Sequence, residues 1–202
     1  MLLRALNKIK EDIKVIYEKD PAANNLAEVI FCYPGFQALL MHRVAHKLSY
    51  WKVPFVPRYI SYLTRIITGI EIHPKAKIGN RVFIDHGDGI VIGETSIIGK
   101  NVKIYQGVTI GALSTRGGQR LSGKKRHPTI CDNVTIYAGA SILGGETIIG
   151  ENTVIGGNAF ITSSIGPNNK VSMKNLEMEY RTSNNEKKTK EVQQGEEWYY
   201  II

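Results

Sequence analysis

The sequence is poor in cysteine and has no long apolar run. Its 202 residues include 2 cysteines, Cys32 and Cys131, too few for a zinc cluster or a disulfide framework. No stretch approaches the roughly 20 apolar residues of a membrane span. The first residues lack the apolar core and cleavage site of a signal peptide. We therefore expect a reduced, cytoplasmic protein with no membrane contact.

Acidic residues are also in the minority. The chain has 26 lysines and arginines against 18 aspartates and glutamates, a formal net charge of +8. This excess suits a polyanion or a small phosphorylated ligand. Because no segment combines a basic stripe with interleaved aromatic residues, we do not expect nucleic acid as a partner. A hydrophobic content of 43% excludes a wholly disordered protein.

Glycine is present but unevenly distributed, and it divides the chain into three parts. Of the 20 glycines, 18 lie between Gly69 and Gly166. Residues 1–68 carry apolar residues at helical spacing and are predicted to form an N-terminal helical domain. Within it, Asp20-Pro21 is predicted to begin the second helix as its N-cap. Residues 174–202 are largely polar and are predicted to form a flexible tail.

Isoleucines recur with a six-residue step between residues 69 and 173. A period of six fits neither an amphipathic helix nor an alternating strand, but it fits a solenoid in which three hexads close one triangular coil. We therefore predict an α+β protein, with a left-handed parallel β-helix of hexapeptide repeats over 69–173. The isoleucines of the repeat are Ile72, Ile78, Ile84, Ile92, Ile98, Ile104, Ile110, Ile130, Ile136, Ile142, Ile149, Ile155 and Ile161.

The repeat has two main interruptions, and insertions in a solenoid go to its surface, often on the binding face. Extra residues occur within 85–89, where His86 beside Asp85 is a candidate general base. A loop over 112–127 contains five basic residues and no acidic one. It suits a ligand with phosphates, although a solvated charged loop is the alternative interpretation. Where the loop ends, Arg126-His127 forms a second polar cluster.

Several motifs resemble those of bacterial serine O-acetyltransferase, the hexapeptide-repeat enzyme of cysteine biosynthesis. They are Asp20-Pro21-Ala22-Ala23, Tyr33-Pro34-Gly35-Phe36-Gln37-Ala38, His42-Arg43-Val44-Ala45-His46, Ile72-His73-Pro74, Asp85-His86-Gly87-Asp88-Gly89 and Arg126-His127-Pro128. The resemblance covers roughly residues 15 to 175. It implies that acetyl passes from acetyl-CoA to the hydroxyl of L-serine, giving O-acetyl-L-serine and CoA.

The resemblance also implies residue roles. His86 is expected to be the general base. Glu71 is expected to orient it, at a position where many members have aspartate. The serine-binding residues would be Asp20 and Asp85 for the amine and Arg126 with His127 for the carboxylate. CoA is expected in a groove between subunits. Its predicted contacts are Gly111, Ala112, Ala138 and Gly139 through the backbone, and Lys124 and Lys125 through charge.

The partners implied by the resemblance are proteins and small molecules. L-Cysteine is expected as a feedback inhibitor, and no metal cofactor is expected. The C-terminal Ile202 is expected to insert into O-acetylserine sulfhydrylase. Because the helical region is short, a homotrimer is predicted rather than a dimer of trimers.

Three alternatives stay open from the sequence. The acceptor could be another hydroxyl compound, although Asp20 and Arg126 argue for an amino acid. A zinc enzyme of the carbonic anhydrase kind would require His73, His86 and His127 to converge on one metal. A regulatory subunit that binds the sulfhydrylase through Ile202 is compatible with catalysis.

Overall fold

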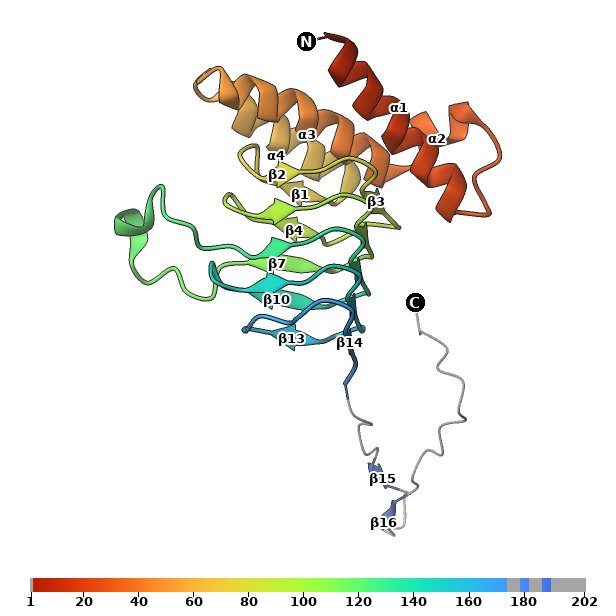
Figure 1. Cartoon of the computed structure of the whole chain (residues 1–202), viewed down its shortest axis with the longest axis vertical. Helices are drawn as coiled ribbons and strands as arrows, with labels where there is room; N and C mark the ends of the chain where they lie inside the picture. The colour runs from red at the N-terminus through yellow and green to blue at the C-terminus, as the bar shows by residue number, and fades with distance from the viewer. Residues whose placement is uncertain (1, 174–178, 182–186, 190–202) are drawn as a thin grey trace.

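A group of helices covers one end of a solenoid of short strands (Figure 1). The computed structural model describes residues 2–173, 179–181 and 187–189. The helices in these residues are α1 (Leu2–Lys19), α2 (Leu26–Cys32), α3 (Pro34–Tyr50) and α4 (Val56–Thr68). The helical character predicted for residues 1–68 is therefore confirmed. None of the described helices is both long enough and apolar enough to cross a membrane.

The predicted start of the second helix is wrong. Helix α2 begins several residues after Asp20-Pro21, with Asn25 as its N-cap. The Asn25 side chain accepts the Glu28 backbone N–H at 3.0 Å and donates to the Glu28 carboxylate at 2.7 Å, which is a reciprocal capping pair. Asp20 instead accepts the backbone N–H of Ala22 at 2.8 Å, so its carboxylate stabilises a turn.

The solenoid is built from three parallel sheets, and successive coils add one strand to each sheet, except that the last coil extends sheet B only by a bridge between Ile149 and Ile165. In spatial order, sheet A consists of β1 (Glu71–Ile72), β4 (Val91–Ile92), β7 (Thr109–Gly111), β10 (Ser141–Leu143) and β13 (Phe160–Ile161). Figure 1 shows these strands stacked below the helices.

The other two sheets complete the triangular coil. Sheet B consists of β2 (Lys77–Ile78), β5 (Ile97–Ile98), β8 (Thr129–Ile130) and β11 (Ile148–Ile149), and sheet C of β3 (Phe83–Ile84), β6 (Lys103–Ile104), β9 (Thr135–Ile136), β12 (Val154–Ile155) and β14 (Lys170–Val171). Residues 112–128 join sheets A and B as a projecting loop that carries the 3₁₀ helix η1 (Gly118–Leu121) (Figure 1). Farther along, β15 (Glu179–Arg181) and β16 (Lys187–Thr189) pair antiparallel.

The predicted six-residue repeat forms the core of the solenoid. Equivalent isoleucines stand in register in successive coils, as in the pairing of Ile72 with Ile92 and of Ile92 with Ile110. Nearly all isoleucines of the repeat are buried in one continuous cluster; Ile78 and Ile161 are partly buried and pack against it. The β-helix predicted from the period is therefore confirmed as three parallel sheets around an isoleucine core.

The helices are fixed to the first coil by buried polar contacts. Ser61 of α4 donates its hydroxyl to the Ile72 carbonyl on the edge strand β1. Arg43 of α3 pairs with the buried Asp12 of α1 at 2.6 Å and donates to the Gly79 carbonyl at 3.1 Å. These contacts hold the segment between α1 and α3 against the first coils, where the candidate site lies.

Acid is expected to destabilise the fold through His42 of α3. This side chain is 5% exposed, and burial, helped by the charges of His46 and Arg43, lowers its pKa from 6.5 to about 3. The unfolded chain therefore binds more protons below pH 6.5, so stability falls as the pH decreases through this range. Between pH 7 and pH 5 we expect His42 alone to remove about 2 kcal/mol, measured by urea unfolding at each pH.

The variant His42→Leu separates this contribution from other titrating groups. Its unfolding free energy should depend less steeply on pH between 7 and 5 than that of the wild type. The remaining slope should come from His73 and His127, because burial lowers the pKa of each to about 4. If the slope were unchanged in His42→Leu, this histidine would not be the source of the acid sensitivity.

Candidate active site

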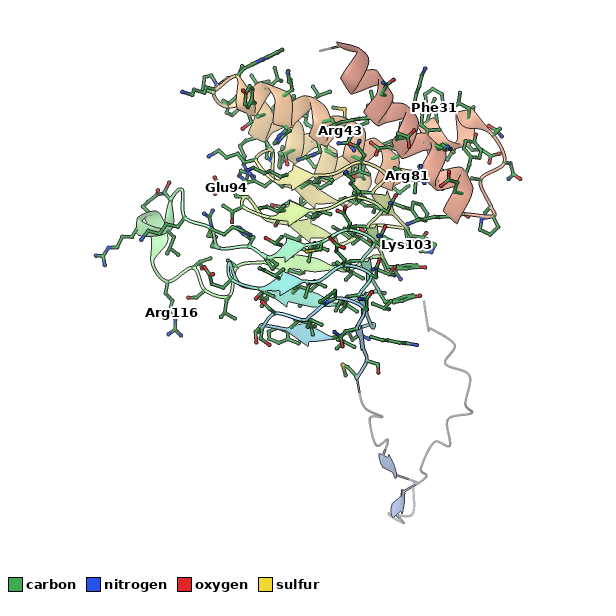
Figure 2. The ribbon with its side chains drawn as sticks, viewed as in Figure 1. Phe31, Arg43, Arg81, Glu94, Lys103 and Arg116 are labelled. Atoms are coloured by element: carbon green, nitrogen blue, oxygen red, sulfur yellow. The ribbon has the colours of Figure 1, made fainter. Side chains whose placement is uncertain are left out.

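The predicted site residues lie at two different corners of the triangular coil, one on each side of sheet A. The chain passes from sheet C to sheet A once in every coil, and residues 85–90, 105–108 and 137–140 of these passages are here called the C–A corner. It passes from sheet A to sheet B through residues 73–76, 93–96 and 126–128, here called the A–B corner. Figure 2 shows the separation, with Glu94 and Lys103 on opposite sides of the solenoid.

The C–A corner presents the candidate general base. His86 lies in the inserted residues with a positive φ of 57°, and its side chain is 64% exposed. Its Nε2 is 3.8 Å from Asp85 Oδ1, which is too long for a hydrogen bond but close enough for electrostatic attraction. The imidazole is therefore open to a substrate and lies beside a carboxylate.

Asp85 is held in place by a lysine that the sequence analysis did not single out. Lys103 Nζ lies 3.1 Å from Asp85 Oδ2. The same ammonium group lies 5.1 Å from the centre of the Phe83 ring and 4.4 Å from that of Tyr105, both within cation–π range. Because Lys103 takes one carboxylate oxygen, the other remains on the side of His86.

A tyrosine joins Asp20 to this corner, and the sequence analysis missed its role. The Tyr33 hydroxyl donates to Asp20 Oδ2 at 2.8 Å. Burial and this hydrogen bond raise the pKa of Tyr33 to about 12, and the charges of Asp20, Glu28 and Asp85 act in the same direction. The charges of Asp20 and Asp85 both raise the pKa of the Tyr33 hydroxyl, so the two carboxylates predicted to bind the amine lie near the same side chain.

The A–B corner orients His127 through one threonine. His127 Nδ1 accepts the Thr95 backbone N–H at 3.1 Å and lies 2.8 Å from the Thr95 hydroxyl. That hydroxyl oxygen in turn accepts the backbone N–H groups of Arg126 at 2.9 Å and His127 at 3.0 Å. Burial and the charge of Arg126 lower the pKa of His127 to about 4. The neutral ring therefore carries its proton on Nε2, as a hydrogen-bond donor.

The guanidinium group of Arg126 forms an ion pair with a carboxylate of the same corner. Glu94 accepts a hydrogen bond from Lys75 Nζ at 2.9 Å and forms an ion pair with Arg126. The hydrogen bonds from Lys75 and Arg126 lower the pKa of Glu94 to about 2, against the effect of burial. Glu94 is thus an anion at neutral pH that fixes Arg126 beside His127.

Glu71, the predicted partner of His86, is paired elsewhere. Its carboxylate lies 2.8 Å from Arg65 Nη1 of α4, and no hydrogen bond joins Glu71 to His86 in the described residues. The predicted CoA contacts are divided in the same way as the serine contacts: Gly111 and Ala112 lie where the chain leaves sheet A for sheet B, and Ala138 and Gly139 lie at the C–A corner.

The two predicted lysines of the loop differ in their contacts. Lys125 Nζ donates to the His127 carbonyl, which ties it to the base of the loop. Lys124 is exposed. The loop thus keeps one lysine at the A–B corner and offers the other to solvent.

A zinc site formed by His73, His86 and His127 does not fit one protomer. His73 and His127 lie at the A–B corner, whereas His86 lies at the C–A corner. Among the described residues, no group of three histidine, cysteine or acidic side chains is placed to hold a metal ion.

Comparison with known proteins identifies the family. No protein-family model matches the chain. A serine acetyltransferase from Synechocystis sp. is 55% identical over 129 residues, which are 64% of this chain and 49% of that protein. One from Staphylococcus aureus is 53% identical over 129 residues, 58% of its length. The crystal structure of Neisseria gonorrhoeae serine acetyltransferase in complex with serine matches with a TM-score of 0.78 and 33% identity, over 85% of this chain and 68% of that one.

The chain belongs to the serine acetyltransferase family. A further solved serine acetyltransferase, isoform 3 of Entamoeba histolytica in complex with cysteine, matches with a TM-score of 0.81 and 40% identity, over 91% of this chain and 63% of that one. The resemblance identified from the motifs is therefore confirmed. This member of the serine acetyltransferase family spans about half the length of the curated relatives it matches.

Proposed function

We propose that the protein transfers acetyl from acetyl-CoA to the hydroxyl of L-serine, as the first step of cysteine biosynthesis from serine. The observation that carries this proposal is the charge of the two corners. Asp20 and Asp85 at the C–A corner suit an ammonium group, and Arg126 with His127 at the A–B corner suits a carboxylate. Together they are complementary to an amino acid whose hydroxyl lies near His86.

In this mechanism the exposed imidazole of His86 takes the proton of the serine hydroxyl as its oxygen attacks the thioester carbonyl of acetyl-CoA. The C–S bond then breaks, and the protonated His86 returns the proton to the CoA thiolate. O-Acetyl-L-serine and CoA are released, so His86 regains its neutral form. Asp85, fixed by Lys103, stabilises the imidazolium that forms between the two steps.

A complete site requires two copies of the chain. Because the C–A and A–B corners lie on opposite sides of sheet A, one protomer cannot bring His86 and Arg126 around one serine. We propose a homotrimer in which each C–A corner faces the A–B corner of the next copy, with a dimer of trimers as the alternative. CoA then lies in the groove between copies, along Gly111 and Ala112 on one side and Ala138 and Gly139 on the other, with Lys124 and Lys125 near its phosphates.

We propose that Glu71 orients His86, as predicted. For this role the Glu71 carboxylate must leave Arg65 and bind the His86 imidazole instead.

We further propose that the β-helix is left-handed, that the domains span residues 1–68, 69–173 and 174–202, and that the protein is located in the cytoplasm. The complex of the Entamoeba histolytica relative with cysteine supports L-cysteine as a ligand, and we propose that it acts as a feedback inhibitor. The predicted contact of Ile202 with O-acetylserine sulfhydrylase falls outside the described residues.

The decisive experiment is an acetyl-transfer assay. Purified protein is mixed with acetyl-CoA, and free thiol is followed with a disulfide reagent in the presence and absence of L-serine. We expect thiol release that depends on L-serine and is not supported by sugar hydroxyls. Without a serine-dependent signal the proposed function is wrong.

Tyr33→Phe tests the amine-binding part of the site. Loss of the hydroxyl removes a hydrogen bond to a charged group, which is worth about a tenfold change in an equilibrium constant. We therefore expect the KM for L-serine to rise about tenfold, with kcat and the KM for acetyl-CoA changing much less. Tyr62→Phe, which removes an exposed hydroxyl on α4, is the matched control. An unchanged KM for serine in Tyr33→Phe would show that Asp20 does not bind the amine.

A further inference from the structure

A cavity of about 180 Å³ lies between the helices and the first coil, and none of the predicted site residues lines it. Its floor is formed by His73 and Lys75 at the A–B corner of the first coil. Its walls come from Ser49 at the end of α3, Phe55 before α4, and Pro57 and Arg58 in the first turn of α4. The lining therefore combines apolar side chains with the hydroxyl group of Ser49 and the nitrogen groups of Arg58, His73 and Lys75.

The surroundings of this cavity carry a surplus of positive charge. No acidic residue occurs between Glu28 and Glu71, so α3, α4 and their connection contribute only cations. Arg58 forms no ion pair or hydrogen bond with any described residue. At the A–B corner, the single carboxylate of Glu94 forms ion pairs with both Lys75 and Arg126. Within the described residues the positive charge of Arg58 is therefore not neutralised, and Glu94 offsets only one of the two charges of Lys75 and Arg126.

His73 adds a neutral donor to these cations. Its Nδ1 accepts the Lys75 backbone N–H at 3.1 Å, so the neutral ring carries its proton on Nε2. Burial and the nearby positive charge of Arg58 lower the pKa of His73 to about 4. A ring that stays neutral for this reason is a hydrogen-bond donor in a region of positive potential.

We propose that this cavity binds a tetrahedral oxyanion of the phosphate or sulfate class, with Arg58, His73 and Lys75 as its ligands. A guanidinium group binds two oxygens of such an anion at once, and the lysine supplies a point charge. The Ser49 hydroxyl offers a further hydrogen bond. The anion is either a free inorganic ion or a phosphate group of a larger molecule. Acetyl transfer does not require this anion, so the proposal is independent of the proposed function.

The test is a titration of the wild-type protein with inorganic phosphate at constant ionic strength. The imidazole signals of His73 are followed by NMR, after assignment with His73→Gln. We expect a saturable shift of these signals. Arg58→Gln and Lys75→Gln should each weaken phosphate binding at least about tenfold, because each removes a charged donor. Lys77→Gln is the matched control, because it removes the same charge from an exposed position on β2 that does not line the cavity.

Two further titrations distinguish the sources of the anion. If a nucleotide phosphate is the natural ligand, CoA displaces inorganic phosphate and CoA without its 3′-phosphate does not. If the ligand is a free oxyanion, neither compound displaces it. Absence of a saturable shift, or equal weakening in Arg58→Gln and Lys77→Gln, would overturn the proposal. Phosphate binding in a protein without acetyl transfer would contradict only the proposed function.

Discussion

Replacement of His86 by alanine is expected to reduce serine-dependent release of CoA by about 10²–10⁴-fold in kcat. His86 is the only histidine at the C–A corner of the described residues, and its imidazole is open to substrate beside Asp85. Without it, the serine hydroxyl has no base to take its proton, and the leaving thiolate has no acid. The KM values for both substrates should change little, because the groups proposed to bind them are retained.

The control for this variant is the replacement of a histidine that is not one of the predicted site residues. His46→Ala removes an imidazole from α3, where its Nδ1 lies 2.7 Å from the Pro74 carbonyl. Circular dichroism establishes that each variant is folded. If folded His86→Ala retained more than about a tenth of the wild-type kcat, general base catalysis by this residue would be refuted.

The hexad period is the part of the structure that the sequence specifies most directly. Equivalent isoleucines must stack because only one residue per strand points into so narrow a coil, and their spacing fixes the register of every strand. The same register also determines which residues distant in the sequence come into contact. Ile98 pairs with Ile130, so Thr95 and His127, each three residues earlier, meet at one corner. Alignment of the coils across the inserted loop would have predicted this contact.

The contacts of the helices could not be derived in this way. Asp20-Pro21 has the composition of a helix start, but the capping pair of Asn25 with Glu28 is reciprocal and begins α2 later. The bond between Tyr33 and Asp20 depends on how α1 and α3 dock on the coil, which no local pattern encodes. Glu71 was placed by resemblance alone, and the position of α4 brings Arg65 to it.

The division of the site between two corners was also not visible in the motifs. In the sequence, His86 and Arg126 are both interruptions of one repeat and look equivalent. Only the order of the strands shows that one interruption lies between sheets C and A and the other between sheets A and B. A site assembled from both corners therefore belongs to two protomers, which has a consequence that can be measured.

Two inactive variants are expected to restore activity when they form one oligomer. His86→Ala damages the C–A corner and Arg126→Ala the A–B corner. In a cyclic trimer of both chains, one of the three interfaces joins the two undamaged corners, so about one third of the wild-type kcat should return. The chains are co-expressed with different affinity tags, and mixed oligomers are isolated by purification on both tags. Activity is then compared with that of each variant alone.

The matched control pairs two defects of the same corner. Asp20→Asn and His86→Ala both damage the C–A side, so no interface in their mixed trimer is complete, and its activity should equal the average of the two single variants weighted by their share of the trimer. If acetyl transfer by this control rose above that average, the recovery would not come from sites formed by two protomers. If mixed trimers of His86→Ala and Arg126→Ala were isolated and remained inactive, the two corners would not act on one serine molecule. Arg126 would then bind a group other than the carboxylate of the serine whose amine lies at Asp20 and Asp85.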